Sequence, residues 1–425
     1  MDGAAAAVSQ AVGAGWASFD PCVMLGHPGD AAPSCSSAAA ASTTLNGREV
    51  CASLRLAAPP AASYVLLDTD DCVGGEEPEV VAADGGLLLI HMLLKPQQGA
   101  PSWESHRFPD PDNFFVYNAG DPEWPWLQCL PSLGGWSGVA HHTDIVARCG
   151  GGGKDFFVAD LQPRAESPTA AGGGTGEVVE LFRYSSATQR WELRRLDMPS
   201  GVGPPLCFDA DAVFAFDGRM CWADYHLGIL LCDVAADDPS LRFVRFPLAE
   251  FREDFSDGRG FPAMHRTACV SGGRLWFVDV DDGRFRRRRA RCSCSSGDGT
   301  ITTWTLRTPE MEWTKEHSLR FSELWSHREY RRSPLPRSTP RFPIVDMRQD
   351  GVLHFIVEAR EDSSELDWTI TVDMRKRRLA SYELYQNAIE VPEADGDVSN
   401  IFFEPLICCE LGGLYANALD KPAGD

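Results

Sequence analysis

The sequence predicts an all-β protein, a β-propeller-like array of four-stranded repeats with about five or six blades. Two observations favour this fold class. From Val50 onward, short runs of β-branched, aromatic and Leu residues alternate with Gly, Asp and Pro turns. No long stretch has a helical period, and Phe251–Phe255 and Leu319–Arg328 are the best short helical candidates. A pair of stacked β-domains is the alternative architecture.

Similar hairpins recur along the chain at intervals of roughly 50–70 residues, which is typical of a radial repeat. In each hairpin, one strand leads through a turn to a strand that carries an aromatic residue. The paired strands are Phe114–Asn118 with Trp124–Leu130, Val178–Tyr184 with Trp191–Leu196, Gly228–Val234 with Leu241–Phe246, Ile301–Leu306 with Trp313–Leu319, and Trp368–Val372 with Leu379–Tyr385. A sheet that is apolar on both faces is buried only between neighbours, which explains the repetition.

A Gly turn and a strongly apolar strand precede such hairpins, as in Asp217-Gly218 followed by Arg219–Trp222. The segment Val50–Asp68 is a candidate sixth blade, or a strand that closes the ring together with Ile401–Leu414. Closure by both termini leaves no exposed edge strand.

Composition divides the chain into two parts. Residues 1–48 are rich in Ala, Ser and Gly and contain few large apolar side chains, so we expect a mostly flexible leader. Residues 49–420 are expected to form a single propeller-like domain, with an Arg-rich loop insertion at residues 283–299.

The charge balance restricts the partners. The chain has 39 Lys and Arg against 61 Asp and Glu, a formal net charge of −22. Such a surface repels polyphosphates and anionic lipid, so we expect neither nucleic-acid nor membrane binding. A basic peptide or protein face is electrostatically compatible with it, and we expect a monomer.

Cysteine usage and the N-terminal residues predict the compartment. The 14 Cys residues are scattered without any Cys-x-x-Cys pair, and the first basic side chain is Arg48, so a charged signal-peptide region is absent. We therefore expect free thiols in a reducing compartment, the cytoplasm, with the nucleus as the alternative.

The segment Cys221–Val234, with the sequence CWADYHLGILLCDV, carries a resemblance to a known family. It resembles the hallmark of a plant family, expanded in grasses, that is catalogued as domain of unknown function (DUF) 1618. Further segments that agree with this pattern are Pro59-Pro60 before Ser63–Val65, Asp84–Leu89, Phe114–Gly120 and Phe157–Leu161. The resemblance extends over Val50–Tyr385 and implies no activity, because none is established for the family. A weaker similarity to kelch and F-box-associated propellers departs from those patterns at its Gly doublets.

Trp222, Asp224, Gly228 and Asp233 form the densest part of this motif. One interpretation is a surface loop that holds a ligand between two strands. The interpretation that we favour is structural: Trp222 lies in the core, Gly228 makes the turn, and the Asp side chains accept hydrogen bonds from turn amides.

Other candidate sites lack the required spacing, so no catalytic, cofactor or metal residue is predicted. His141-His142 with Asp144 is unsuited to one metal ion, because adjacent strand residues point to opposite faces. The thiols of Cys292, Cys294 and Cys408-Cys409 lack zinc-site spacing. The run Gly150–Asp155 lacks the first Gly and the hydroxyl residue of a phosphate-binding loop.

One basic cluster interrupts the acidic background, and it is the candidate contact for an acidic partner or a nuclear-localisation signal. Its members are Arg284, Arg286, Arg287, Arg288, Arg289 and Arg291. The alternative is a solvated insertion between strands. A second run, Arg375–Arg378, is expected to be a polar turn.

Two functions of different classes follow. The preferred hypothesis is a non-catalytic interaction module that binds a protein or peptide through a propeller face. The alternative is an enzyme, a hydrolase or lyase with its site at the channel mouth, which fold analogy alone supports. Convergence of Asp, Glu and His side chains with shifted pKa values in one pocket distinguishes the enzyme.

Overall fold

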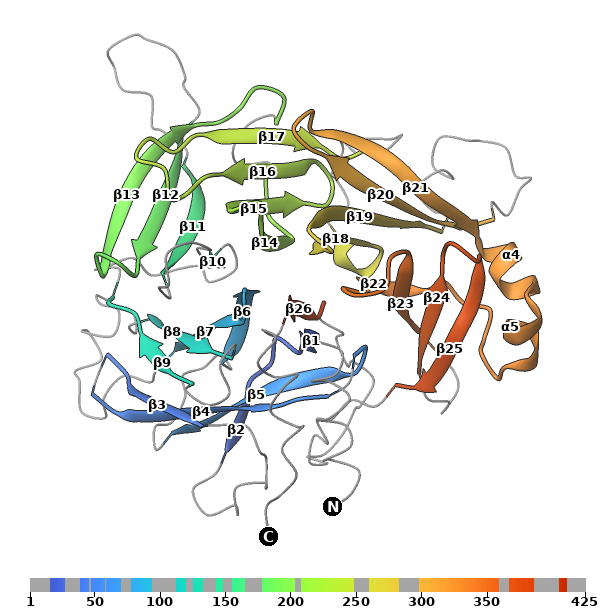
Figure 1. Ribbon diagram of the computed structural model, residues 1–425, viewed down its shortest axis with the longest axis horizontal. Coiled ribbons are helices and arrows are strands. Elements are labelled where there is room, and N and C mark those ends of the chain that lie inside the picture. Colours follow the sequence, from blue (N-terminus) through green and yellow to red (C-terminus); the bar gives the residue numbers. More distant parts are fainter. Residues whose placement is uncertain are drawn as a thin grey trace. The chain divides into compact units, whose positions relative to one another are not determined.

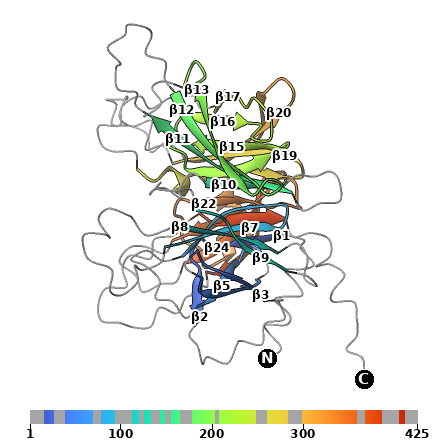
Figure 2. The ribbon, with the colours of Figure 1, turned by 90° about the vertical axis from the view of Figure 1, so that its left-hand side faces the viewer.

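The computed structural model describes residues 16–26, 39–45, 47–57, 59–69, 78–93, 112–119, 125–132, 143–147, 155–164, 178–202, 208–247, 260–282, 298–358, 367–385 and 405–410. The described elements are almost all strands, arranged in six sheets (Figure 1). Figure 2 shows the same strands after a quarter turn.

Five of the sheets are four-stranded, and their strands are adjacent in chain order. They comprise β6 (Glu79–Asp84), β7 (Leu87–Leu93), β8 (Asp112–Asn118) and β9 (Leu127–Cys129); β10 (Thr143–Ala147), β11 (Phe156–Arg164), β12 (Val178–Ser185) and β13 (Arg190–Asp197); β14 (Ala212–Phe216), β15 (Arg219–Asp224), β16 (Gly228–Cys232) and β17 (Leu241–Arg245); β18 (Arg266–Ser271), β19 (Arg274–Asp281), β20 (Thr300–Arg307) and β21 (Glu312–Arg320); and β22 (Arg341–Val345), β23 (Val352–Val357), β24 (Trp368–Asp373) and β25 (Arg378–Leu384). This strand order is that of propeller blades, so the predicted all-β, propeller-like fold is confirmed, with six sheets.

The first sheet joins strands from both ends of the sequence. Its order is β26 (Ile407–Glu410), β1 (Trp16–Phe19), β5 (Ala62–Thr69), β4 (Glu49–Arg55) and β3 (Ala40–Thr43), and β2 (Met24–Gly26) also pairs with β5. Residues 1–48, expected to be a mostly flexible leader, therefore include three strands. Pairing on both sides orders β1, whose four residues are all buried.

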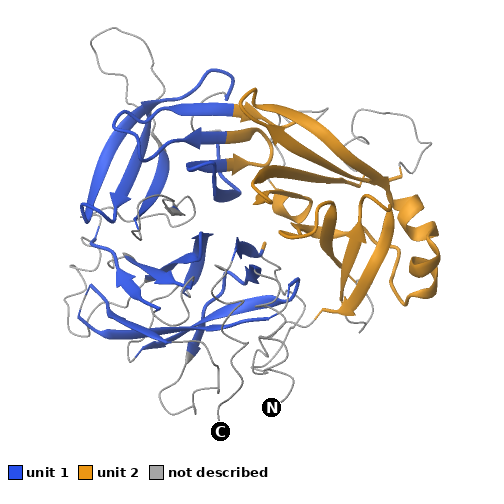
Figure 3. Cartoon of the chain, in the orientation of Figure 1, with its two compact units in different colours: residues 1–222, 230–243, 406–425 blue, residues 223–229, 244–405 orange. Residues whose placement is uncertain are grey.

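The chain divides into two compact units (Figure 3). Unit 1 comprises residues 1–222, 230–243 and 406–425, and unit 2 comprises residues 223–229 and 244–405. Unit 2 contains the described helices η3 (Pro262–Met264), α4 (Phe321–Ser326) and α5 (Arg328–Arg332). The helix expected within Leu319–Arg328 is α4, whereas Phe251–Phe255 lies outside the described residues. None of the described helices has the length and apolar character needed to cross a lipid bilayer.

Short turns set the register between first and second strands. Asp217 and Gly218 both have positive φ, 51° and 71°, as a two-residue type I′ hairpin requires. The doublets Gly85-Gly86 and Gly272-Gly273 have the same signature. These turns fix which side chains of the following apolar strand face each neighbouring sheet.

In two sheets, the indole of a fourth-strand tryptophan donates to a backbone carbonyl near the end of the preceding sheet and within the same unit. Trp191 Nε1–H donates to the carbonyl of Pro131 at 2.7 Å, and Trp313 Nε1–H donates to the carbonyl of Arg245 at 2.8 Å. The aromatic residue that recurs in the predicted hairpins therefore serves to connect consecutive sheets.

Candidate functional site

The two ends of the four-stranded sheets have different connections. Because consecutive strands are antiparallel, the first-to-second and third-to-fourth connections lie at one end, which we call the tight-turn end. The second-to-third connections and those leading to the next sheet lie at the other, the loop end. Tight-turn connections include residues 85–86, 186–189, 217–218, 272–273, 308–311 and 374–377. Loop-end connections include residues 94–111, 130–142, 165–177, 198–211, 246–265, 282–299 and 321–340.

Within unit 1, the sheet β6–β9 packs against the sheet β10–β13. Leu87 and Leu89 belong to the same buried cluster as Phe156 and Val158. Gln128 Nε2–H donates across this interface to the hydroxyl of Tyr184 at 3.1 Å. Since side chains alternate along a strand, every second residue of β7 and β11 faces this interface.

Polar side chains follow the apolar ones on these facing surfaces, toward the loop end. His91 is the fifth residue of β7 and Asp160 the fifth residue of β11. Their neighbours on the same faces are Glu79, paired with His91, and Gln162 and Glu180, paired with each other. We call Glu79, His91, Asp160, Gln162 and Glu180 the Asp160 cluster.

Asp160 is the most unusual member, with only 5% of its surface exposed. Gln162 Nε2–H donates to Asp160 Oδ2 at 2.6 Å. Asp160 Oδ1 is buried and has no hydrogen-bond partner among the described residues. Burial raises the pKa of the Asp160 carboxyl to about 7, although hydrogen bonds from Gln162 and the Leu161 amide oppose this shift.

His91 and Glu79 form the other half of the cluster. His91 Nδ1 lies 3.6 Å from Glu79 Oε1, and its ring centroid lies 4.9 Å from that of Phe114. Exposure of the side chains is 9% for His91 and 32% for Glu79. Within the cluster, the Asp160 carboxyl is therefore buried and the Glu79 carboxyl is partly exposed.

The chemistry available here is that of acceptors and proton carriers. Three carboxyl groups and one imidazole can accept hydrogen bonds, attract a cation or exchange a proton. Among the described residues, no group of three or more His, Cys, Asp or Glu side chains is placed to hold a metal ion.

The motif residues have structural contacts. Trp222 has no exposed surface, and Gly228 begins the buried strand β16. Asp224 Oδ1 accepts hydrogen bonds from the amides of His226 (2.8 Å) and Leu227 (3.2 Å). These bonds close the shortest of the second-to-third connections, residues 225–227.

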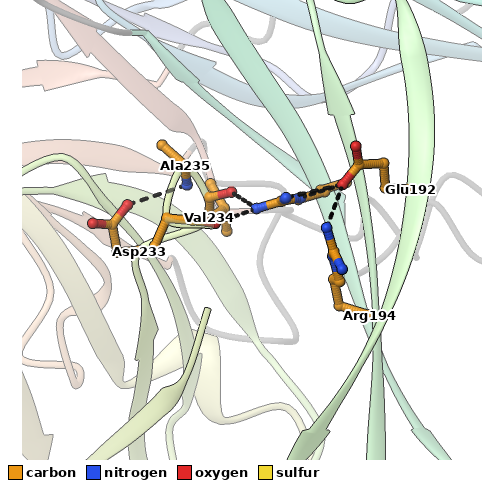
Figure 4. Close-up of polar contacts among 7 residues, drawn as sticks. Glu192, Arg194, Asp233, Val234 and Ala235 are labelled. Carbon is orange, nitrogen blue, oxygen red and sulfur yellow. Dashed lines mark hydrogen bonds and ion pairs between the residues drawn. The ribbon is translucent and has the colours of Figure 1, made fainter. Parts of the chain in front are cut away.

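The other end of the motif is a turn that a buried arginine holds (Figure 4). Asp233 Oδ1 accepts a hydrogen bond from the amide of Ala235 at 3.1 Å. Arg183 Nη1 donates to the carbonyls of Val234 (2.9 Å) and Ala236 (2.6 Å). Its guanidinium also pairs with a Glu192 carboxylate oxygen, which in turn accepts from Arg194.

In unit 2, a second arginine holds the connection 225–227. Arg266 Nη1 donates to the carbonyl of Tyr225 at 2.7 Å, and Arg266 Nε pairs with Asp279 Oδ1 at 2.8 Å. The Tyr225 hydroxyl accepts from the amide of Ala268. The motif is thus a compact turn joined to the neighbouring strand β18.

The arginine runs have different outcomes. The cluster of Arg284, Arg286–Arg289 and Arg291 lies outside the described residues, in the connection between β19 and β20. The run Arg375–Arg378 spans the β24–β25 turn, where Arg377 pairs with Glu323 and Lys376 with Asp373. That turn is polar, and its residues 375–377 are exposed, as expected.

The remaining candidates add no site. His141, His142, Cys292, Cys294 and residues 150–154 lie outside the described residues. Cys408 and Cys409 lie in β26 as thiols. Burial raises the pKa of the Cys409 thiol to about 12, so the unreactive thiol form dominates.

A small apolar cavity lies on the opposite face of the sheet β10–β13 from the Asp160 cluster. Leu161, Val179, Phe208 and Trp222 line it, and its volume of about 10 Å³ has room for one water molecule. Its walls are apolar, so it is a packing gap.

Asp160 was not among the predicted site residues. Its segment Phe157–Leu161 was recognised only as part of the family pattern. The available signal was an Asp within an apolar run, at the place where Ala159-Asp160 parallels Ala223-Asp224 in β15. A charged residue at a buried strand position needs a partner or a function.

Comparison with known proteins bears on this motif. The family model described as "Protein of unknown function (DUF1618)" matches residues 222–354. The match confirms the resemblance recognised in Cys221–Val234. A search of curated proteins finds no match. Plant origin and cellular compartment stay predictions.

Solved structures give distant likenesses. The Hadza microbial sialidase Hz136 has a TM-score of 0.33 and 12% identity, covering 80% of this chain and 66% of that chain. The β-fructofuranosidase catalytic domain of Microbacterium saccharophilum K-1 has a TM-score of 0.24 and 11% identity, covering 69% and 59%. This chain spans less than two thirds of either enzyme's length, and likenesses at these TM-scores say nothing about its activity.

Proposed function

We propose that this protein is an interaction module that binds a protein or peptide through the loop ends of its sheets. The observation that carries the proposal is the contrast between the two ends. Connections of two to eight residues join the strands at one end of each four-stranded sheet, and connections of more than a dozen residues recur at the other, where residues 225–227 are a short exception. Recognition segments on a rigid scaffold are commonly built in this way, because loops vary while the sheets keep their packing.

Charge favours a basic partner. The net charge of −22 attracts cationic proteins over several ångströms and raises their association rate. Salt weakens attraction of this kind, so binding is expected to fall as ionic strength rises. The arginine cluster at 284–291 is a separate proposed contact for an acidic patch of the partner.

The test uses the tagged full-length protein and its loop-end variants. In one variant, short Gly-Ser linkers replace residues 94–111 and 165–177. In a matched control, a Gly-Ser linker replaces the tight turn 186–189. In a third variant, Arg284, Arg286–Arg289 and Arg291 are changed to Ala. Proteins captured from the native tissue are quantified by mass spectrometry at low and high salt.

A partner that is captured reproducibly by the wild type and the tight-turn control, and lost from a loop-end variant, supports the proposal. Equal capture by all variants, or capture of nothing, contradicts it. Circular dichroism and thermal unfolding of each variant distinguish lost binding from lost folding.

An enzyme, a hydrolase or lyase, is the second candidate. The observation that favours it is the Asp160 carboxyl, because a group with a pKa near 7 can donate or accept a proton at neutral pH. Metabolite profiling with wild type and Asp160→Asn tests it. A small molecule consumed by the wild type alone supports the enzyme.

A further inference from the structure

The unpaired oxygen of Asp160 is an acceptor that the described part of the chain does not satisfy. Buried carboxylate oxygens in folded proteins nearly always accept hydrogen bonds, because an unmet acceptor forfeits its hydration. Gln162 satisfies only Oδ2. An incoming donor at Oδ1 therefore gains a bond that costs the protein no existing one.

The charges that face Asp160 favour a positively charged donor. The facing surface of the sheet β6–β9 carries Glu79 and His91, and the surface of its own sheet carries Glu180 and, on β13, Arg195. Arg195 pairs with Glu180 at 3.5 Å and is 69% exposed, whereas Glu180 is 8% exposed. Glu79 and Glu180 thus set two acidic side chains against the single guanidinium of Arg195, so these described neighbours favour a cation near the buried acceptor.

The cluster lies toward the loop end of both sheets. Asp160 pairs with Thr143, the first residue of β10, whereas β11 continues to Arg164. Toward the loop end, β11 therefore extends four residues beyond its pairing with the first residue of β10. Gln162 and Glu79, the members nearest that end, are partly exposed.

We propose that the Asp160 cluster receives the cationic side chain, lysine or arginine, of a basic segment in the bound partner. This inference rests on the proposed function, and it identifies the chemistry of one contact. The ammonium or guanidinium group donates to Asp160 Oδ1, and its second charge partner is the Glu79–His91 pair. The aliphatic stem of the side chain packs between the two sheets.

The experiment follows the Asp160 carboxyl directly. Full-length protein labelled with ¹³C at the aspartate carboxyl carbons is titrated from pH 5 to 9 by NMR. The probe is acetyl-Gly-Lys-Gly-amide, and acetyl-Gly-norleucyl-Gly-amide is its uncharged counterpart. The resonance missing from Asp160→Asn identifies Asp160. Backbone spectra of that variant establish that it folds.

The expected result is a pKa of Asp160 that falls by about one unit with saturating lysine peptide, which corresponds to tenfold tighter binding to the ionised carboxylate. The affinity accordingly rises as pH increases toward 8. The norleucine peptide leaves the pKa unchanged. Asp217→Asn removes one exposed carboxylate and is the matched control: it should bind the peptide as the wild type does, whereas Asp160→Asn should lose the pH-dependent part.

An Asp160 resonance that millimolar lysine peptide does not shift, or binding that Asp160→Asn leaves intact, overturns the inference. Capture of the partner separates this failure from failure of the proposed function. A partner that still binds Asp160→Asn but not the loop-end variants leaves the proposed function standing without this contact. If the lysine peptide shifts the pKa of Asp160 but no partner is captured, the cation-binding site stands and the proposed function does not.

Discussion

Asp160 and Asp224 are buried carboxyl groups at the ends of apolar segments of second strands, and their surroundings differ. Asp224 precedes a three-residue connection, and its Oδ1 accepts from two amides of that connection. Asp160 precedes the long connection 165–177, and its Oδ1 has no partner among the described residues. The same residue type thus closes a turn in β15 and remains available for a donor in β11.

The difference shows how the position of the turn changes the role of one side chain. A connection that starts directly after Asp224 folds back on its carboxylate and supplies amide donors to it. At Asp160 the paired strand continues for four more residues, to Arg164, so the amides that follow bond within the sheet. The family motif includes Asp224, so it marks the position at which the buried Asp closes a turn.

The largest effect is expected from Asp224→Ala. The substitution leaves the buried amides of His226 and Leu227 without their acceptor, which costs about 3 kcal/mol of the free energy of unfolding. Urea unfolding measures the loss. Asp238→Ala, at an exposed position with ordinary backbone angles, is the control and should change stability by less than about 0.5 kcal/mol. A similar small change in both variants would mean that the carboxylate at 224 does not hold the turn.

Asp160→Asn should have the opposite sign, and its effect should depend on pH. The folded pKa of Asp160, about 7, lies above the ordinary aspartate pKa of 3.8, so the folded state binds the proton more tightly than the unfolded chain. Stability conferred by the protonated group is fully present below pH 4 and is lost as pH rises toward 7. The asparagine side chain does not ionise, so the stability of this variant does not fall in the same way as pH rises.

At pH 8, Asp160→Asn should therefore be more stable than the wild type by roughly 2 kcal/mol. The gain is smaller than the free energy that corresponds to the whole pKa shift, because one buried atom of the asparagine amide stays unpaired. At pH 4 the two proteins should be nearly equal. Urea unfolding at both pH values measures this difference. Parallel stability curves for the two proteins over this range would contradict an unpaired carboxyl at position 160.

The smallest effect is expected from Asp233→Ala, which removes one acceptor from an exposed turn. Water can replace the lost bond to the Ala235 amide, so we expect a loss of about 0.5–1 kcal/mol. Arg183 still holds the neighbouring carbonyls. Thermal unfolding is the measurement. A loss of stability as large as that of Asp224→Ala would show that solvent exposure at Asp233 does not reduce the cost of losing its hydrogen bond.

The repeated strands could be predicted from the sequence because their signals are local. The hairpin expected at Ile301–Leu306 and Trp313–Leu319 is the pair β20–β21, and the expected Gly turn at Asp217-Gly218 is a two-residue hairpin. Alternating apolar residues and turn-forming residues specify both without reference to the rest of the chain.

Strands that depend on distant partners could not be predicted in the same way. β3 consists of Ala40–Thr43, and small side chains carry little strand propensity, so its pairing with β4 determines its conformation. The availability of Asp160 is likewise tertiary. The sequence shows an Asp in an apolar strand but not whether its two oxygens find donors.

The measurement that tests the comparison most directly is the carboxyl titration of the free protein by ¹³C NMR, with Asp160→Asn and Asp224→Asn used to assign the two resonances. The account predicts that the pKa of Asp160 is about 7, because burial without a donor at Oδ1 favours the protonated form. A pKa near 3.8 for Asp160 would mean that its carboxylate already has a full set of partners, and that it is a structural group like Asp224.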